Sequence, residues 1–532
     1  MLAKYFAGFR CGGHLLSLCV VALMLVAMPV LAADARNPIL YADVPDMAMI
    51  RVGETYYMSS TTMHMSPGVP IMKSQDLVNW TIVNNAYDTL DDVDALNLAN
   101  GKRAYGKGSW ASSIRFHEGT FYVTTFAQTT GKTYIYSTKD IERGPWKKVS
   151  FKPALHDHSL FFDDDGRVYM IFGGGDLRLV ELSADVTNVK PGGLNEIIIT
   201  NAGAVAGPNI GLNAEGSQLF KVNGKYFLFN ITWPRGGMRT VIIHRADKIT
   251  GPWEGRVALQ DKGVAQGGLI DTPAGEWFAY LFRDSGAVGR IPYLVPVKWE
   301  DGWPMLGVDG KVPDTLKLPV SLGLIPGIVA SDEFNRQSGE PALPLVWQWN
   351  HNPDNALWSV TQRPGFLRLT TGRVDADIEA ARNTLTQRTI GPECSGTTCL
   401  DVSNLKNGDY AGLVSLQKNY GFVGVTSDGG TNFVVMVSAE SNAPQELARV
   451  PLNQKTVFLK AECDFRGRAD KAYFSYSCDG KSWVPIGGTL KMSYSLAHFM
   501  GYRFGLFNYA TRTAGGFADF DFFHISDKIN NH

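Results

Sequence analysis

The sequence predicts an all-β protein in which a five-bladed β-propeller is followed by a β-sandwich. Two observations predict this architecture. One short pattern recurs five times in the N-terminal half of the chain, and the C-terminal region holds many short strands with no helical periodicity. Repeats of roughly 50 residues that are built from short hairpins are typical of propellers.

Each copy of the pattern combines an apolar stretch, a turn marked by glycine and an aromatic-rich strand. The turns are Val52-Gly53-Glu54, Glu118-Gly119-Thr120, Asp165-Gly166-Arg167, Asn223-Gly224-Lys225 and Ala274-Gly275-Glu276. The strands behind them are Tyr56–Ser60, Phe121–Phe126, Val168–Phe172, Tyr226–Asn230 and Trp277–Phe282. Because a propeller gathers the first strand of every blade around one axis, side chains on these first strands are expected to converge.

A second recurring motif supports the blades. The order strand, polar pair, Asp, short turn, Trp occurs at Lys73–Trp80, Ser137–Trp146 and His244–Trp253, and in a weaker form at Leu182–Val186. The Asp can cap its turn through its own side chain. The Trp then begins the outer strand and packs between blades, so we interpret these residues as structural.

The composition is that of a globular protein and excludes some classes of function. The 532 residues are 45% hydrophobic and 19% charged, which argues against disorder, and the length implies two or three domains. The formal net charge is −1 with no basic stripe, so a nucleic-acid partner is not expected.

Residues 1–32 are predicted to form a secretory signal peptide. Lys4 and Arg10 are the only charges before the apolar run Leu15–Ala27, and small residues offer a cleavage site after Ala32. A retained membrane anchor is the alternative, but the apolar run is shorter than the ~20 residues of a spanning helix. We expect export to the periplasm or the medium, with no membrane attachment after cleavage.

Three further regions follow the signal peptide. Residues 33–312 are expected to form the propeller, 313–330 a Pro- and Leu-rich linker, and 331–526 the sandwich. Strands predicted in the last region include Gly365–Leu369, Ala411–Leu416 and Phe517–Phe523.

Four cysteines remain after the signal peptide: Cys394, Cys399, Cys463 and Cys478. Export permits disulfides, and four cysteines allow three connectivities. Cys463 and Cys478 flank a predicted hairpin around Arg466–Lys471 and could face each other across it, whereas Cys394 and Cys399 could close a small loop. Free thiols are the alternative, and the spacing lacks the pattern of a zinc site.

Three of the five first strands carry an acid near their start. Asp46, Asp157 and Glu215 lie at similar distances before the glycine turns, where the other two copies have Ser112 and Gly268. An acid on a strand often belongs only to a turn or an edge. Each of these three precedes an apolar strand, however, and an unpaired buried carboxylate is costly. We therefore interpret the three acids as functional.

Three acids at one axis suit the hydrolysis of a glycosidic bond. One carboxylic acid protonates the leaving oxygen, and a second carboxylate takes a proton from water. Crowding and partial burial raise the pKa of one carboxyl group and so separate the two roles. This chemistry requires no metal and no organic cofactor.

Six motifs follow one another along the chain. They are Asn37-Pro38-Ile39-Leu40 with Pro45-Asp46, Gly108-Ser109-Trp110-Ala111, Asp157 to Gly166, Glu215-Gly216-Ser217-Gln218-Leu219, Gly267 to Pro273, and Asp301-Gly302-Trp303-Pro304. In this order they resemble glycoside hydrolase family 43. The C-terminal region resembles the concanavalin-like sandwich of the β-xylosidase and α-L-arabinofuranosidase members of that family.

The resemblance implies a five-bladed propeller and an inverting mechanism. Asp46 would be the general base and Glu215 the general acid, while Asp157 would tune the pKa of the acid and orient it. Trp110 would form a wall of the sugar subsite, and Arg290 would bind sugar hydroxyls or the acid pair. The alternatives are blade packing for Trp110 and a surface ion pair for Arg290.

The chain departs from the family pattern at two positions. His158 follows Asp157 where the family often has Pro, and Gln266 stands where many members carry a His near a central ion. A structural Ca²⁺ at the propeller centre therefore stays an open alternative, in which His156 or His158 would replace the missing His.

We expect an exported, exo-acting glycosidase that removes terminal α-L-arabinofuranosyl or β-D-xylosyl residues. Its substrate would be a plant cell-wall hemicellulose, namely arabinoxylan, xyloglucan or arabinan, or their oligosaccharides. The sandwich is expected to close one side of the pocket. A non-catalytic carbohydrate-binding propeller is the alternative, against which the complete acid triad argues.

Overall fold

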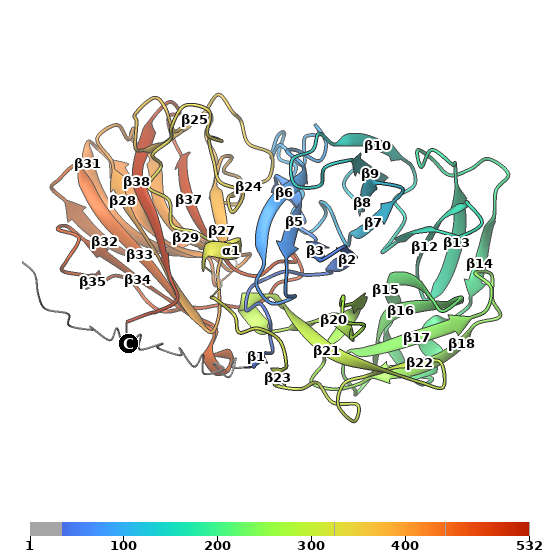
Figure 1. Ribbon diagram of the computed structural model, residues 1–532. Helices are drawn as coiled ribbons and strands as arrows, with labels where there is room; N and C mark the ends of the chain where they lie inside the picture. The colour runs from blue at the N-terminus through green and yellow to red at the C-terminus, as the bar shows by residue number, and fades with distance from the viewer. Residues whose placement is uncertain (1–33, 324, 442, 531–532) are drawn as a thin grey trace, which may run out of the picture. The chain divides into compact units, whose positions relative to one another are not determined.

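The computed structural model describes residues 34–323, 325–441 and 443–530 (Figure 1). The predicted signal peptide lies outside these residues. Within them, no helix is long and apolar enough to cross a membrane. The described chain is almost entirely β-structure. Its helices are the short α1 (Ile325–Ile328) and the single 3₁₀ turns η1 (Ala202–Ala206), η2 (Gly286–Val288) and η3 (Arg466–Arg468).

Five four-stranded antiparallel sheets form the predicted propeller. In chain order the blades are β2 (Ala48–Val52), β3 (Thr55–Ser59), β5 (Gly68–Ser74) and β6 (Thr81–Tyr87); β7 (Ser113–His117), β8 (Thr120–Ala127), β9 (Lys132–Thr138) and β10 (Lys147–Phe151); β11 (Ser159–Phe162), β12 (Val168–Gly174), β13 (Asp176–Leu182) and β14 (Asn195–Ile199); β15 (Ile210–Val222), β16 (Lys225–Pro234), β17 (Thr240–Ala246) and β18 (Glu254–Leu259); β19 (Ala265–Asp271), β20 (Trp277–Asp284), β21 (Arg290–Glu300) and β22 (Trp303–Leu306). The first strands β2, β7, β11, β15 and β19 contact one another in a closed ring. The ring brings the five predicted first strands to one axis.

The expected turn caps form at Asp76 and Asp140 of the second motif, whereas Asp247 is 80% exposed and pairs with Lys225 instead. The Asp76 carboxylate accepts the backbone amides of Val78 and Asn79 at 2.9 and 2.7 Å. Asp140 caps its own turn in the same way. Trp80 is 3% exposed. It lies in the hydrophobic core and directly precedes the outer strand β6.

Two large antiparallel sheets form the C-terminal sandwich. One runs in the order β32 (Gln445–Leu452), β31 (Thr431–Ser438), β30 (Gly421–Asp428), β29 (Asp409–Leu416), β37 (Arg503–Ala510), β27 (Leu385–Arg388), β24 (Gln348–Asn350) and β4 (Met65–Ser66). The other runs β25 (Trp358–Ser359), β26 (Leu367–Thr370), β38 (Phe517–Ser526), β28 (Glu393–Asp401), β33 (Thr456–Asp464), β34 (Lys471–Ser477) and β35 (Val484–Pro485), with β36 (Leu490–Lys491) also on β34. The buried rings of Phe504 and Phe523, one from each sheet, meet in the core between them.

The propeller and the sandwich share a sheet. Strand β4 leaves the first blade between β3 and β5 and pairs with β24 at the edge of the sandwich sheet. The segment expected to be a linker also contains regular structure, namely α1 and β23 (Thr315–Leu316). Strand β23 pairs with β1 (Ala35–Arg36) at the start of the described chain.

Both cysteine pairings considered from the sequence are wrong, because strand geometry separates the partners. Cys394 and Cys399 lie on the single strand β28, where residues five apart face opposite sides of the sheet. The hairpin around Arg466–Lys471 exists, but its register sets Cys463 opposite Ala472 and leaves Cys478 exposed beyond β34. All four thiols are free, and the register neighbour of Cys463 on β28 is the buried Cys394.

Three imidazoles are buried together where the first blade meets the sandwich. The ring of His64 lies 4.6 Å from that of His351 and 6.0 Å from that of His498, centre to centre. Neither nitrogen of His64 has a hydrogen-bond partner among the described residues. Burial is the largest cause that lowers the pKa of all three imidazoles. Arg503 lowers the pKa of His64 further and Arg103 that of His351 and His498, whereas Glu379 opposes the fall in the pKa of His498.

We expect the folded state to lose stability as the pH falls through the ordinary histidine range, near 6.5. Below that pH the histidines bind protons in the unfolded chain but stay neutral in the folded cluster, so acid favours unfolding. Above that pH both states are neutral, and no stability is lost through these groups. Thermal unfolding between about pH 8 and pH 5 measures the effect. His64→Phe is expected to flatten the dependence, and His117→Gln on the partly exposed His117 is the control. Equal slopes for the two variants would contradict the assignment.

Candidate active site

The three acids singled out in the sequence lie together at the inner ends of their blades. Asp46 precedes β2, Asp157 precedes β11, and Glu215 lies within β15. A carboxylate oxygen of Asp157, one of Glu215 and a nitrogen of His156 lie within 4.8 Å of one another. Asp46 and Asp157 line one cavity of about 10 Å³. The structure therefore brings the predicted acids to one place.

Unusual backbone conformations aim these side chains. Asp46 has φ 49° and Asp157 has φ 48°, in the left-handed region that costs a non-glycine residue roughly 1–2 kcal/mol. Glu215 is aimed differently: the register of β15 against β16 shifts on both sides of it, and Gly216 follows with φ 67°. Bulges and strained residues of this kind cluster at functional sites.

Asp46 forms a buried ion pair with Arg290. The Arg290 Nη1 donates to Asp46 Oδ1 at 2.6 Å, and the side chains are 5% and 4% exposed. Burial raises the pKa of Asp46, and the charge of Arg290 opposes that rise. Arg290 also lies 3.7 Å from Asp284 Oδ1. It is therefore not part of a surface ion pair, which was the alternative considered from the sequence.

Asp157, His156 and Glu215 form a second set of interacting groups. His156 Nε2 lies 3.2 Å from Glu215 Oε2 and 3.9 Å from Asp157 Oδ2. Burial raises the pKa of Asp157 to about 7 even though His156 lies beside it. Burial alone would lower the pKa of His156, but the hydrogen bond to Glu215 and the surrounding carboxylates raise it to about 9. The set can therefore hold and exchange protons near neutral pH.

His158 and the cavity at the propeller centre do not match a calcium shell, although His156, Asp157 and Glu215 each offer a ligand atom within 4.8 Å of the others. His158 Nδ1 donates to Leu155 O and Nε2 bonds to Thr124 Oγ1, at 2.8 Å each, so His158 has no free ligand atom. Gln266 also lines the cavity, which has room for about one water. Ca²⁺ takes six to eight oxygen ligands, and Asp46 and Asp157 are already bonded to Arg290 and to the Gly216 amide.

An aromatic side chain from the sandwich completes the site. Phe499 precedes β37 and has φ 56°. The centre of its ring lies 4.6 Å from the Trp110 ring and 4.4 Å from the guanidinium carbon of Arg290. Trp110 is half-buried, and its Nε1 has no hydrogen-bond partner among the described residues. Phe499 thus brings the sandwich into contact with Trp110 and Arg290, and closure of the pocket by the sandwich stays a prediction.

A second residue that the sequence analysis missed, Asp43, ties these parts together. Its Oδ1 accepts the backbone amide of Arg290 at 2.7 Å, and its Oδ2 accepts that of Gly501 at 2.8 Å. One buried carboxylate therefore fixes both the arginine that pairs with Asp46 and the loop that carries Phe499. Its only signal in the sequence is an acid in an apolar stretch three residues before Asp46.

Carboxylates that converge at the axis of a five-bladed propeller suit the hydrolysis of a glycosidic bond. The model of glycosyl hydrolases family 43 matches residues 35–304, and that of the β-xylosidase C-terminal concanavalin A-like domain matches residues 331–526. The chain belongs to glycosyl hydrolases family 43. It is therefore a glycoside hydrolase of the hemicellulose-degrading kind.

Individual relatives point to the same group of enzymes. A β-xylosidase of Formosa agariphila is 30% identical over 92% of this chain and 89% of its own length. A non-reducing end α-L-arabinofuranosidase of Bacteroides ovatus is 26% identical over 66% of this chain and 68% of its own. The structure of a bifunctional GH43-CE protein of Bacteroides eggerthii matches with a TM-score of 0.93 and 66% identity over 94% of this chain. This chain covers 64% of that longer protein.

Phe499→Ala is expected to lower kcat/KM for terminal pentosides about tenfold, because it removes a wall of the site and the ring beneath the Arg290 guanidinium. Steady-state kinetics measures the loss. Phe366→Ala is the matched control, since Phe366 stacks on Arg363 elsewhere in the sandwich, with the guanidinium carbon 3.6 Å from the ring centre. Equal kinetics for the two variants would remove Phe499 from the site.

Proposed function

We propose that the protein is an exported, exo-acting, inverting glycosidase that releases terminal α-L-arabinofuranosyl or β-D-xylosyl residues from hemicellulose. The observation that carries the proposal is the convergence of Asp46, Asp157 and Glu215 at one site. The names of the relatives, a β-xylosidase and an α-L-arabinofuranosidase, support a pentosyl substrate.

In this proposal Asp46 acts as the general base. Its carboxylate takes a proton from the water that attacks the anomeric carbon. Arg290 holds the carboxylate in place through the 2.6 Å hydrogen bond and favours its ionised form against the effect of burial on its pKa. In the proposal the same guanidinium also contacts sugar hydroxyls, and the hydrogen bond from the Arg290 amide to Asp43 supports its backbone.

Glu215 acts as the general acid and protonates the leaving oxygen. Asp157 orients it, because Asp157 Oδ2 accepts the amide of Gly216, the next residue, at 3.0 Å. Asp157 and His156 carry exchangeable protons beside the acid at neutral pH, so they can restore its proton after each turnover.

The aromatic wall supports attack at a chain end. Trp110 and Phe499 close the space beside Arg290 from two different domains, which suits a single terminal sugar better than an internal segment of a polymer. Both pentosyl groups present hydroxyls at similar positions, so one small pocket can accept either of them.

Assays on paired aryl α-L-arabinofuranosides and β-D-xylosides, then on branched oligosaccharides, test the proposed substrate. We expect single pentoses as products, and internal cleavage would overturn the exo-acting assignment. Proton NMR of the first-formed sugar is expected to show the inverted anomer. The N-terminal residue of protein recovered from the periplasm or medium tests export, with cleavage after Ala32 expected.

We also expect catalysis to need no added metal. Dialysis against a chelator should leave kcat unchanged, because the acid and base roles are filled by side chains and the residues around the central cavity do not match a calcium shell. The melting temperature measured in parallel reports any structural ion. Loss of activity that Ca²⁺ restores would overturn this expectation.

A further inference from the structure

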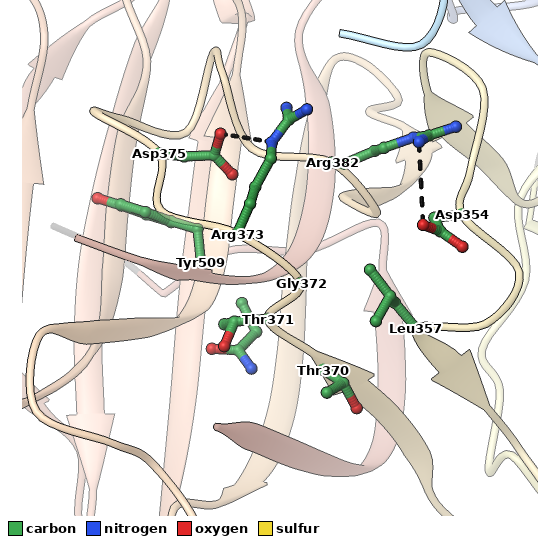
Figure 2. Close-up of a pocket in the computed structure, with 10 residues that line it drawn as sticks. Asp354, Leu357, Thr370, Thr371, Gly372, Arg373, Asp375, Arg382 and Tyr509 are labelled. Carbon is green, nitrogen blue, oxygen red and sulfur yellow. Dashed lines mark hydrogen bonds and ion pairs between the residues drawn. The ribbon is translucent and has the colours of Figure 1, made fainter. Parts of the chain in front are cut away.

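The sandwich holds a second polar pocket that the proposed reaction does not use (Figure 2). Its cavity measures about 90 Å³ and shares no residue with the cavity at the catalytic acids. The side chains that matter for its chemistry are Asp354, Arg373, Asp375, Arg382, Asn508 and Tyr509. They come from the loops on either side of β25 and β26 and from β37.

The charges of this pocket balance. Figure 2 shows Arg373 joined to Asp375 and Arg382 joined to Asp354. Arg373 Nε donates to Asp375 Oδ1 at 2.8 Å, and Arg382 Nη1 lies 3.9 Å from Asp354 Oδ2. Two guanidinium groups against two carboxylates leave no net charge to attract a phosphate or a polyanion. A neutral ligand with many hydroxyls fits, because a hydroxyl both donates to a carboxylate and accepts from a guanidinium.

One acceptor in the pocket lacks a partner. Asn508 is 5% exposed, and its Nδ2 donates to Leu369 O at 2.8 Å. This bond sets the orientation of the amide. Its Oδ1 is buried with no hydrogen-bond partner among the described residues. An unpaired buried acceptor is costly, so Asn508 Oδ1 is a polar group beside the pocket whose hydrogen bonding is incomplete.

The pocket also offers apolar surface, and some of its side chains are fixed in place by their neighbours. Tyr509 is buried, and its ring stacks on Tyr410 with centres 5.4 Å apart and planes 11° apart. Leu357 supplies an aliphatic wall. The Arg373 side chain is fixed by a further bond from Nη2 to Ala380 O at 2.7 Å. A site whose groups are already held loses less entropy when a ligand binds.

A neighbouring cavity extends the pocket toward the propeller. It measures about 290 Å³, shares Arg373 and Asp375 with the first, and is also lined by Asn100 and Arg103. These two residues belong to the segment between β6 and β7, which further along carries Trp110 of the active site. The two cavities together have room for more than one sugar unit.

We propose that this pocket, with Arg373 and Asp375 at its centre, is a second carbohydrate site that binds a neutral pentosyl chain. The choice of a pentosyl chain rests on the proposed function, whereas the affinity for a neutral oligosaccharide follows from the pocket itself. The site would hold the polymer while chain ends are hydrolysed at the acids.

Isothermal titration of the full chain carrying Glu215→Gln tests the proposal, with xylohexaose and a linear arabino-oligosaccharide as separate probes. We expect two ligands per chain for the probe that matches the polymer, and one after Arg373→Ala is added. Arg449→Ala is the matched control, because Arg449 is an equally exposed sandwich arginine with carboxylate partners, 35% against 37% exposed, outside the pocket. It should keep two ligands.

One ligand per chain before Arg373 is changed, or two ligands after it, would overturn the second site. If Arg373→Ala fails to fold by circular dichroism, Thr370→Trp takes its place, because it fills the cavity and leaves both ion pairs intact. It is also expected to reduce two ligands to one. Hydrolysis of aryl pentosides by the unaltered chain tests the proposed function separately, so either idea can fail alone.

Discussion

Replacing Glu215 by glutamine is expected to lower kcat for natural pentosides by roughly a thousandfold. Glutamine keeps the size of the side chain but has no acidic proton for the leaving oxygen. Substrates with good aryl leaving groups should lose much less, because they need little protonation. Sugar binding should persist. Steady-state kinetics on both substrate classes, with a binding titration, measures the difference.

Glu196→Gln is the control for this variant. Glu196 is an exposed glutamate on β14, away from the acids, so its substitution should leave kinetics unchanged. Wild-type turnover in the Glu215→Gln variant would show that another group supplies the proton. His156, 3.2 Å from Glu215, would then be the first candidate.

Asp46→Asn is expected to remove turnover on every substrate, natural or activated, by a factor of roughly 100 to 10,000. The base is needed whatever the leaving group, so this pattern separates its role from that of Glu215. The variant should also lose about 3 kcal/mol of stability, because Arg290 stays buried without its closest partner. Kinetics and chemical denaturation measure the two effects.

A second substitution separates the two consequences. Asp46→Asn combined with Arg290→Met removes both buried charges and is expected to recover stability without recovering turnover. Asp164→Asn, at an acid that is 83% exposed on a propeller turn, serves as the control for both measurements. Full activity in the Asp46→Asn variant would exclude Asp46 as the base.

The propeller could be predicted from the sequence because its information is local and repeated. Each glycine turn lies between two strands that are consecutive in the chain and pair with each other, so the hairpin can be recognised without knowledge of the rest of the fold. The acids were visible for the same reason, since Asp46, Asp157 and Glu215 recur at similar positions in equivalent strands. The sandwich was predicted only as a class.

What escaped prediction depends on contacts between distant segments. Phe499 comes from the sandwich and Asp43 contacts the sandwich at Gly501, and neither follows a period that a sequence pattern could reveal. The pairing of β4 with the sandwich sheet has no recognisable sequence pattern, because β4 is only two residues long. The cysteine pairings failed since a hairpin fixes partners by register, which the position of the turn alone does not determine.

The pairing of β4 with the sandwich can form only after the sandwich strand β24 has been synthesised. β4 is made among the first residues of the propeller, whereas its partner β24 and, further along, the loop that carries Phe499 follow hundreds of residues later. At 5–20 residues per second this delay is on the order of tens of seconds. During that time the propeller exposes an unpaired edge and an incomplete site. The nascent enzyme is therefore expected to be inactive until the sandwich has been translated as far as Phe499.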